Sequence, residues 1–219
     1  MTSNDSQESS AIPAMESASE TVRRIFGNDG SSLGAEIADE ASRYERLNAA
    51  LFPLPSRTRC LAVANQKGGV GKTTTTVNIA AALASHGAHV LVIDMDPQGN
   101  ASTACGVPHG TSDPSVYDVL EGRMTIGEVL KTCPDIPGLD VVPASIELSG
   151  AELEVADLPN RNNLLKEAVE SFLQDPNNHY DYVLVDCPPS LGLLVINSMC
   201  AVSEMLIPPW RGLVNLSIP

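Results

Sequence analysis

The residues best suited to chemistry stand in one short run, Lys67-Gly-Gly-Val-Gly-Lys-Thr-Thr74. Small residues let successive backbone N–H groups curve around phosphate oxygens, and a helix that starts directly afterwards adds its positive end. The Lys72 side chain can reach β and γ phosphates, and the Thr73 hydroxyl can ligate Mg²⁺. The run therefore predicts a nucleotide-phosphate site made by Lys67, Gly68, Gly69, Val70, Gly71, Lys72, Thr73 and Thr74.

This run departs from the usual phosphate-loop pattern, G-x-x-x-x-G-K-[ST]. Gln66 stands where the pattern has its first glycine, and a second lysine, Lys67, follows it. Lys67 has two interpretations: a cation that acts on phosphate charge, or a solvated lysine of an ordinary loop. A glycine-rich turn alone would be weak support, but two lysines with Thr-Thr favour the nucleotide site.

Three aspartates end apolar segments elsewhere in the chain. Asp94 and Asp96 stand two residues apart, so their carboxylates can project to the same side of an extended chain. Asp186 ends another apolar segment. A single aspartate in such a place is commonly a turn or cap residue. That explanation does not readily cover three aspartates at strand ends flanking a phosphate loop, so all three are candidate site residues.

Alternating strands and helices must position these residues. Short all-apolar runs are typical of parallel strands buried on both faces, and here they alternate with segments of helical periodicity. The alternation predicts an α/β fold, a mainly parallel sheet with helices on both faces. The predicted strands are 60–64, 89–94, 139–143, 182–186 and 204–208, and the predicted helices are 35–51, 72–86, 162–173 and 191–202.

The segment Ala64-Asn-Gln-Lys-Gly-Gly-Val-Gly-Lys-Thr-Thr74 resembles the deviant Walker A motif of the ParA/MinD superfamily of P-loop NTPases. The resemblance implies ATP and Mg²⁺ as cofactors. It also implies that the extra lysine, matched by Lys67, reaches across a nucleotide-sandwiched homodimer to the partner's phosphates. A mobile cation there meets the charge that develops during phosphoryl transfer, as an arginine finger does.

Two further motifs resemble the same superfamily, Asp94-Met-Asp-Pro-Gln-Gly-Asn100 and Asp186-Cys-Pro-Pro-Ser-Leu-Gly192. The resemblance implies that Asp96 orients the attacking water, which makes Lys67 and Asp96 the catalytic residues. It implies that Thr73, Asp94 and Asp186 serve the metal, Asp186 through water. It further implies that the Gly192 backbone senses the γ-phosphate.

The first of these motifs and the segment Pro143-Ala-Ser-Ile-Glu-Leu-Ser-Gly-Ala-Glu-Leu-Glu154 resemble ParA (Soj-like) chromosome and plasmid partition ATPases. This resemblance implies a weak, partner-stimulated ATPase that acts as an ATP-dependent dimerisation switch. It implies a ParB-like partner and non-specific binding to DNA. A MinD-like division-site ATPase is a further alternative.

Composition narrows the possible classes. The 219 residues have a formal charge of −14 and are 43% hydrophobic, which suits one domain with a tail, or two very small domains, and excludes collagen-like, coiled-coil and wholly disordered chains. Five cysteines without a C-x-x-C pair favour reduced, cytoplasmic thiols. We expect no membrane association, and a nucleoid location if DNA binding is retained.

However, residues 60–219 carry seven basic and eighteen acidic side chains, a charge of −11, so the basic surface that DNA requires is not visible.

We expect four segments along the chain. They are a disordered polar tail (1–33), a short amphipathic helix with a linker (34–59), the P-loop ATPase domain (60–208) and an end that does not match the superfamily (209–219). Because the superfamily continues beyond the position of Pro208, we expect the C-terminal part of the fold to be missing through truncation or a shifted reading frame. Two hypotheses follow: a competent ATPase switch, or a non-catalytic remnant that binds nucleotide or pairs with a full-length copy.

Overall fold

The structure is a computed structural model that describes residues 20–21, 24–25, 32–49, 53–155 and 158–209. It has two units, residues 1–52 and 53–219, and each is described by itself. In the first unit, helix α2 spans Ser32–Ala49, with Ala38 buried and Tyr44 exposed. No helix among the described residues has the length and apolar character needed to cross a membrane. The predicted tail (1–33) and the predicted non-matching end (209–219) lie almost wholly outside these residues, so both stay predictions.

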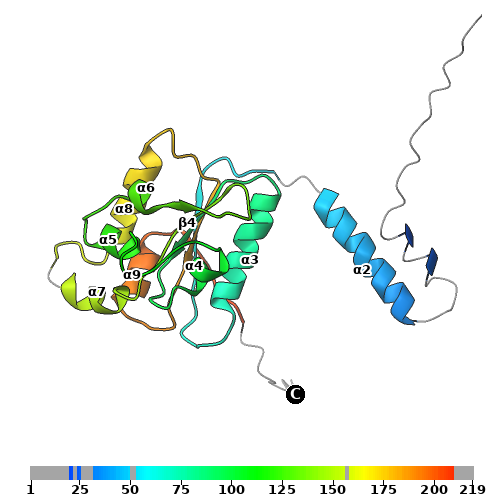
Figure 1. Ribbon diagram of the computed structural model, residues 1–219, viewed down its shortest axis with the longest axis horizontal. Helices are drawn as coiled ribbons and strands as arrows, with labels where there is room; N and C mark the ends of the chain where they lie inside the picture. The colour runs from blue at the N-terminus through cyan, green and yellow to red at the C-terminus, as the bar shows by residue number, and fades with distance from the viewer. Residues whose placement is uncertain (1–19, 22–23, 26–31, 50–52, 156–157, 210–219) are drawn as a thin grey trace, which may run out of the picture. The chain divides into compact units, whose positions relative to one another are not determined.

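A six-stranded sheet with the order β3-β4-β2-β5-β1-β6 forms the centre of the second unit (Figure 1). Five strands run parallel, and only the short strand β3 pairs in the antiparallel sense, with β4. This arrangement confirms the predicted, mainly parallel sheet. The strands are β1 (Arg59–Val63), β2 (Val90–Asp94), β3 (Lys131–Thr132), β4 (Leu139–Val142), β5 (Tyr182–Asp186) and β6 (Glu204–Leu206).

Both faces of the sheet are apolar because successive side chains of a strand point to opposite sides. On β2, Val90 and Val92 belong to one core cluster, whereas Leu91 and Ile93 belong to the other. All four side chains are fully buried. The sheet therefore needs a layer of helices on each face.

Helices supply these two layers (Figure 1). On one face, α3 (Lys72–Ser85) and α4 (Asn100–Ala104) contribute the small residues Ala80, Ala84 and Ala101 to the core. The other face is covered by α5 (Val116–Leu120), α6 (Ile126–Val129), α7 (Leu148–Glu154), α8 (Leu164–Gln174) and α9 (Leu193–Cys200). Helices α3, α8 and α9 correspond to predicted helices, with ends that differ by at most two residues.

The short elements α4, α5, α6 and β3 were not predicted, because none is long enough to show a clear helical or strand period. Local caps specify two of them. In α5, the Asp118 carboxylate accepts a hydrogen bond from the Ser115 N–H at 3.0 Å. In α6, the Glu128 carboxylate accepts one from the Thr125 N–H at 2.7 Å. The patterns S-x-x-D and T-x-x-E are the sequence features that would have found these helices.

Strand register decides which residues meet at the carboxyl edge of the sheet. Asp186 is level with Asp94 on one neighbouring strand and with Val63 on the other. The segment that follows Val63 leads to the glycine-rich run, so all the predicted site segments leave the sheet at one edge.

We expect Leu91→Ala to lower the free energy of unfolding by about 2 to 5 kcal/mol, because it leaves a cavity under the helices of one face. Leu91 is fully buried, whereas Leu54, the control position, is 51% exposed. Urea unfolding followed by circular dichroism measures the change. An equal loss for Leu91→Ala and Leu54→Ala would contradict the described core.

Candidate functional site

The glycine-rich run forms an open loop between β1 and α3. Gly69 has φ +72° and Gly71, which caps α3, has φ +84°. Residues that carry a side chain rarely adopt this left-handed backbone conformation, so both positions favour glycine. A Cβ atom added at Gly68, Gly69 or Gly71 would meet nothing within 4 Å. The three glycines therefore border open space at a helix N-terminus, where phosphate oxygens can be accommodated.

Asn65 holds the start of this loop, a role that sequence reasoning missed. Its side-chain oxygen accepts a hydrogen bond from the Lys67 N–H at 3.0 Å, and its Nδ2 donates to the Pro208 carbonyl at 3.0 Å. Asn65 thus joins the loop to the chain that follows β6. A polar residue directly after a buried strand was the available sequence feature.

The two lysines of the loop have different surroundings. The Lys72 side chain is buried, and its Nζ lies 3.5 Å from the Lys67 carbonyl, so it bends back over the loop. Lys67 itself is exposed. Of the other predicted loop residues, Val70 is half-buried and Thr74 is exposed.

Two threonines of α3 hold the Asp186 carboxylate. The Thr73 hydroxyl donates to Oδ2 at 2.7 Å, and the Thr76 hydroxyl lies 2.9 Å from Oδ1. Burial raises the pKa of Asp186 to about 6; the two threonine hydroxyls act against this, and the nearby Asp94 and Asp96 carboxylates add to it. The structure thus brings together Thr73 and Asp186, two of the three predicted metal residues. Thr76, which sequence reasoning did not include, completes the contact.

Asp94, the third predicted metal residue, contacts Ser102 rather than Thr73. The Ser102 hydroxyl and N–H both donate to Asp94 Oδ2, at 2.7 Å and 2.8 Å. Burial raises the pKa of Asp94, although these hydrogen bonds partly oppose the shift. Asp94 therefore lies beside Asp186 on the neighbouring strand β2, and Ser102 of α4 holds its carboxylate through hydrogen bonds.

Asp96 and Gly192 lie on segments that leave the same edge of the sheet. The Asp96 carboxylate is largely buried and accepts a hydrogen bond from the Gln98 N–H at 3.0 Å. Gly192 precedes α9 as its N-cap in an extended conformation. The predicted residues thus occupy the ends of β1, β2 and β5, where ligands of open α/β sheets bind.

The sequence profile of the AAA domain family matches residues 58–212. The chain belongs to this family. The chain is 47% identical over 151 residues to the chromosome partitioning protein ParA of Caulobacter vibrioides. It is 45% identical over 150 residues to the sporulation initiation inhibitor protein Soj of Bacillus subtilis.

The chain is thus similar to a ParA protein and a Soj protein over part of their length. Each alignment covers 68% of this chain, 55% of the Caulobacter protein and 57% of the Bacillus protein. The chain therefore spans about half the length of the curated relatives it matches.

Solved structures share the fold of this AAA domain. Mycobacterium smegmatis cobyrinic acid a,c-diamide synthase, with a bound ATP analogue and magnesium, matches with a TM-score of 0.65 and 38% identity, over 74% of this chain and 64% of that one. The septum site-determining protein MinD of Pyrococcus horikoshii, complexed with Mg-ADP, matches with a TM-score of 0.57 and 28% identity, over 69% and 58%. The predicted P-loop fold of the ParA/MinD type is confirmed.

We expect the free energy of unfolding of the wild-type AAA domain to rise relative to that of the Asp186→Asn variant as the pH falls. Both proteins are measured in EDTA and without nucleotide. The pKa of Asp186 is raised from 3.8 to about 6, so the folded chain binds this proton more tightly than the unfolded chain. The relative stabilisation is full below about pH 3.8 and is lost as the pH rises through about 6. Urea unfolding from about pH 4 to about pH 8 measures the difference.

Asp135→Asn is the matched control, because Asp135 is exposed. A flat difference between wild type and Asp186→Asn over this pH range, or the same slope for Asp135→Asn, would contradict the described environment of Asp186.

Proposed function

We propose that this AAA domain binds and hydrolyses ATP as a ParA-like dimerisation switch in chromosome or plasmid segregation. The observation that carries the proposal is the contact of Thr73 and Thr76 with the buried Asp186 carboxylate, directly after an open glycine loop. A hydroxyl beside a carboxylate at the start of a helix is the donor set that Mg²⁺-nucleotide sites of P-loop proteins use.

The residues present fit ATP and Mg²⁺. Backbone N–H groups of residues 68–74 would contact the phosphates, with Lys72 as the cation nearest to them. Thr73 and Asp186 would hold Mg²⁺, and Asp94 would support the magnesium shell from β2. Among the described residues, no group of three or more Asp, Glu, His or Cys side chains could form a metal cage. Mg²⁺ takes most of its ligands from phosphates and waters and neutralises phosphate charge when bound.

Two residues would serve the reaction itself. We assign to Asp96 the positioning of the attacking water. Its carboxylate, which follows the end of β2, is largely buried. We assign to Lys67 the stabilisation of the charge that develops on the phosphoryl group, in the second subunit of a homodimer. The exposure of Lys67 agrees with a role outside its own subunit. We assign to the Gly192 backbone the sensing of the γ-phosphate at the start of α9.

The relatives' names support the biological role. The Caulobacter protein is named for chromosome partitioning, and we extend that role to this chain, with a ParB-like partner and cytoplasmic, nucleoid-associated action. The charge of −11 over residues 60–219 argues against strong non-specific DNA binding by these residues alone. A nucleotide-binding protein without turnover is the second candidate, and the similarity to MinD keeps a division-site role as a third.

We expect Lys67→Ala to retain ATP binding but to lose hydrolysis by at least about tenfold, because the cation acts mainly on transition-state charge. Asp96→Ala should likewise retain ATP binding and lose hydrolysis. Binding is measured with a fluorescent ATP analogue, and turnover by phosphate release with duplex DNA and a ParB-like protein present. Lys166→Ala is the matched control, since Lys166 is an exposed lysine of α8 that pairs with Glu170.

The outcomes separate the first two candidate functions. Turnover that is sensitive to Lys67 supports the switch. ATP binding without turnover in the wild type overturns it in favour of the non-catalytic candidate. Absence of ATP binding contradicts both.

A further inference from the structure

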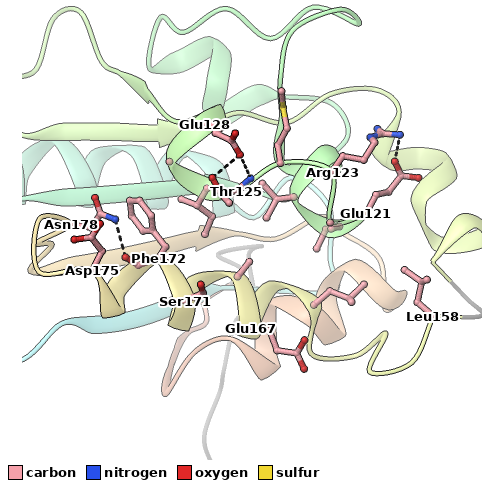
Figure 2. Close-up of a pocket in the computed structure, with 18 of the residues that line it drawn as sticks. Glu121, Arg123, Thr125, Glu128, Leu158, Glu167, Ser171, Phe172, Asp175 and Asn178 are labelled. Atoms are coloured by element: carbon pink, nitrogen blue, oxygen red, sulfur yellow. Dashed lines mark hydrogen bonds and ion pairs between the residues drawn. The ribbon is translucent and has the colours of Figure 1, made fainter.

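A groove of about 740 Å³ lies away from the glycine loop, between the α5–α6 segment and helix α8 (Figure 2). One wall is formed by residues 119–128, and the other by α8 and the residues just before and after it. No residue of the phosphate loop lines it. We call it the α8 groove. Because it is separate from the nucleotide site, binding to the two places can be measured independently.

The floor of the α8 groove is apolar. Four half-buried apolar side chains line it and pack against the core beneath α5 to α9: Met124, Leu164, Ala168 and Phe172. Leu158, at one end of the groove, is 39% exposed. Such a floor provides apolar contact area for the side chains of a bound molecule.

The rim of the groove is acidic. It carries the carboxylates Glu121, Glu128, Glu167 and Asp175, against a single cation, Arg123 (Figure 2). Arg123 is already engaged, because its guanidinium pairs with Glu121 and Asp118 and lies 4.7 Å from the Tyr117 ring centroid. The rim therefore has a surplus of negative charge.

Three of these carboxylates can still accept further hydrogen bonds. The contacts within the chain use Oε2 of Glu128, Oε1 of Glu167 and Oδ1 of Asp175. A carboxylate has two acceptor oxygens, so each of these three groups has an oxygen for an incoming N–H donor, whereas Glu121 already pairs with Arg123 and Tyr117. Phosphate-bearing ligands are disfavoured here, because the same charges repel them.

We propose that the α8 groove binds a basic amphipathic helical segment of a partner protein. Charge complementarity selects this occupant: lysine or arginine side chains would meet the rim carboxylates Glu128, Glu167 and Asp175, and leucine-type side chains would lie on the floor. An amphipathic helix presents both kinds of side chain at spacings of three and four residues, which is how helices bind in grooves.

The test uses a fluorescein-labelled, amidated peptide of about 15 residues, near the shortest length at which an isolated helix forms. It carries leucines at helical spacing on one face and lysines beside them. We expect saturable binding by fluorescence anisotropy that weakens as salt is added. Glu167→Lys should weaken binding by about tenfold, because it replaces an attraction with a repulsion.

Glu170→Lys is the matched control. Glu170 is on the same helix and carries the same charge but does not line the groove. Affinity should change by less than about twofold in this variant. An equal loss in Glu167→Lys and Glu170→Lys would overturn the proposal, since it would show attraction to the overall negative charge of the chain.

A second pair of variants tests shape rather than charge. Ser171→Trp fills the groove, whereas Gln174→Trp adds the same side chain to α8 outside it. We expect only Ser171→Trp to weaken binding by at least about tenfold. Circular dichroism melting confirms that each variant is folded. No binding of the basic peptide at low salt, or equal binding of a peptide with glutamates in place of lysines, would also overturn the proposal.

Discussion

The burial of the Asp186 carboxylate is the constraint on which the geometry of the site depends. A buried carboxylate without donors costs several kcal/mol, so the chain must supply hydrogen bonds to it. Thr73 and Thr76 supply them from the start of α3. The Asp186 carbonyl also accepts a hydrogen bond from the Met95 N–H at 3.0 Å, which continues the pairing of β5 with β2. One residue thus joins the phosphate-loop helix to the two central strands.

The same edge of the sheet is connected to the walls of the α8 groove. The Val116 N–H, at the start of α5, donates to the Pro143 carbonyl at 2.8 Å, and the Ala144 N–H donates to the Ser102 hydroxyl at 3.1 Å. On the other side, Asn197 of α9 donates to the Arg161 carbonyl at 2.7 Å. Both walls are therefore hydrogen-bonded to segments that begin beside the nucleotide site, even though the groove lies apart from it.

Charge is distributed unevenly in this domain, and the distribution separates two kinds of surface. Lys67 and Lys72 stand together at the helix N-terminus that faces the open loop, where a phosphate gains from both cation and dipole. The α8 groove combines an apolar floor with surplus carboxylates, which suits a cationic segment. A net charge of −11 over residues 60–219 is thus compatible with a nucleotide site, because two of the seven cations, Lys67 and Lys72, belong to the loop where phosphate would bind.

The sequence by itself determined the strand and helix alternation, the phosphate loop and the aspartates at the strand ends. Apolar runs and glycine spacing are local patterns, so they can be recognised without knowing the neighbours. The tertiary structure alone decided that Thr76 shares the Asp186 carboxylate, that Ser102 engages Asp94, and that Asn65 reaches Pro208. It also decided that α5, α6 and α8 enclose an acidic groove. These contacts join residues 8 to 143 positions apart or depend on strand order, and no local period in the sequence encodes either.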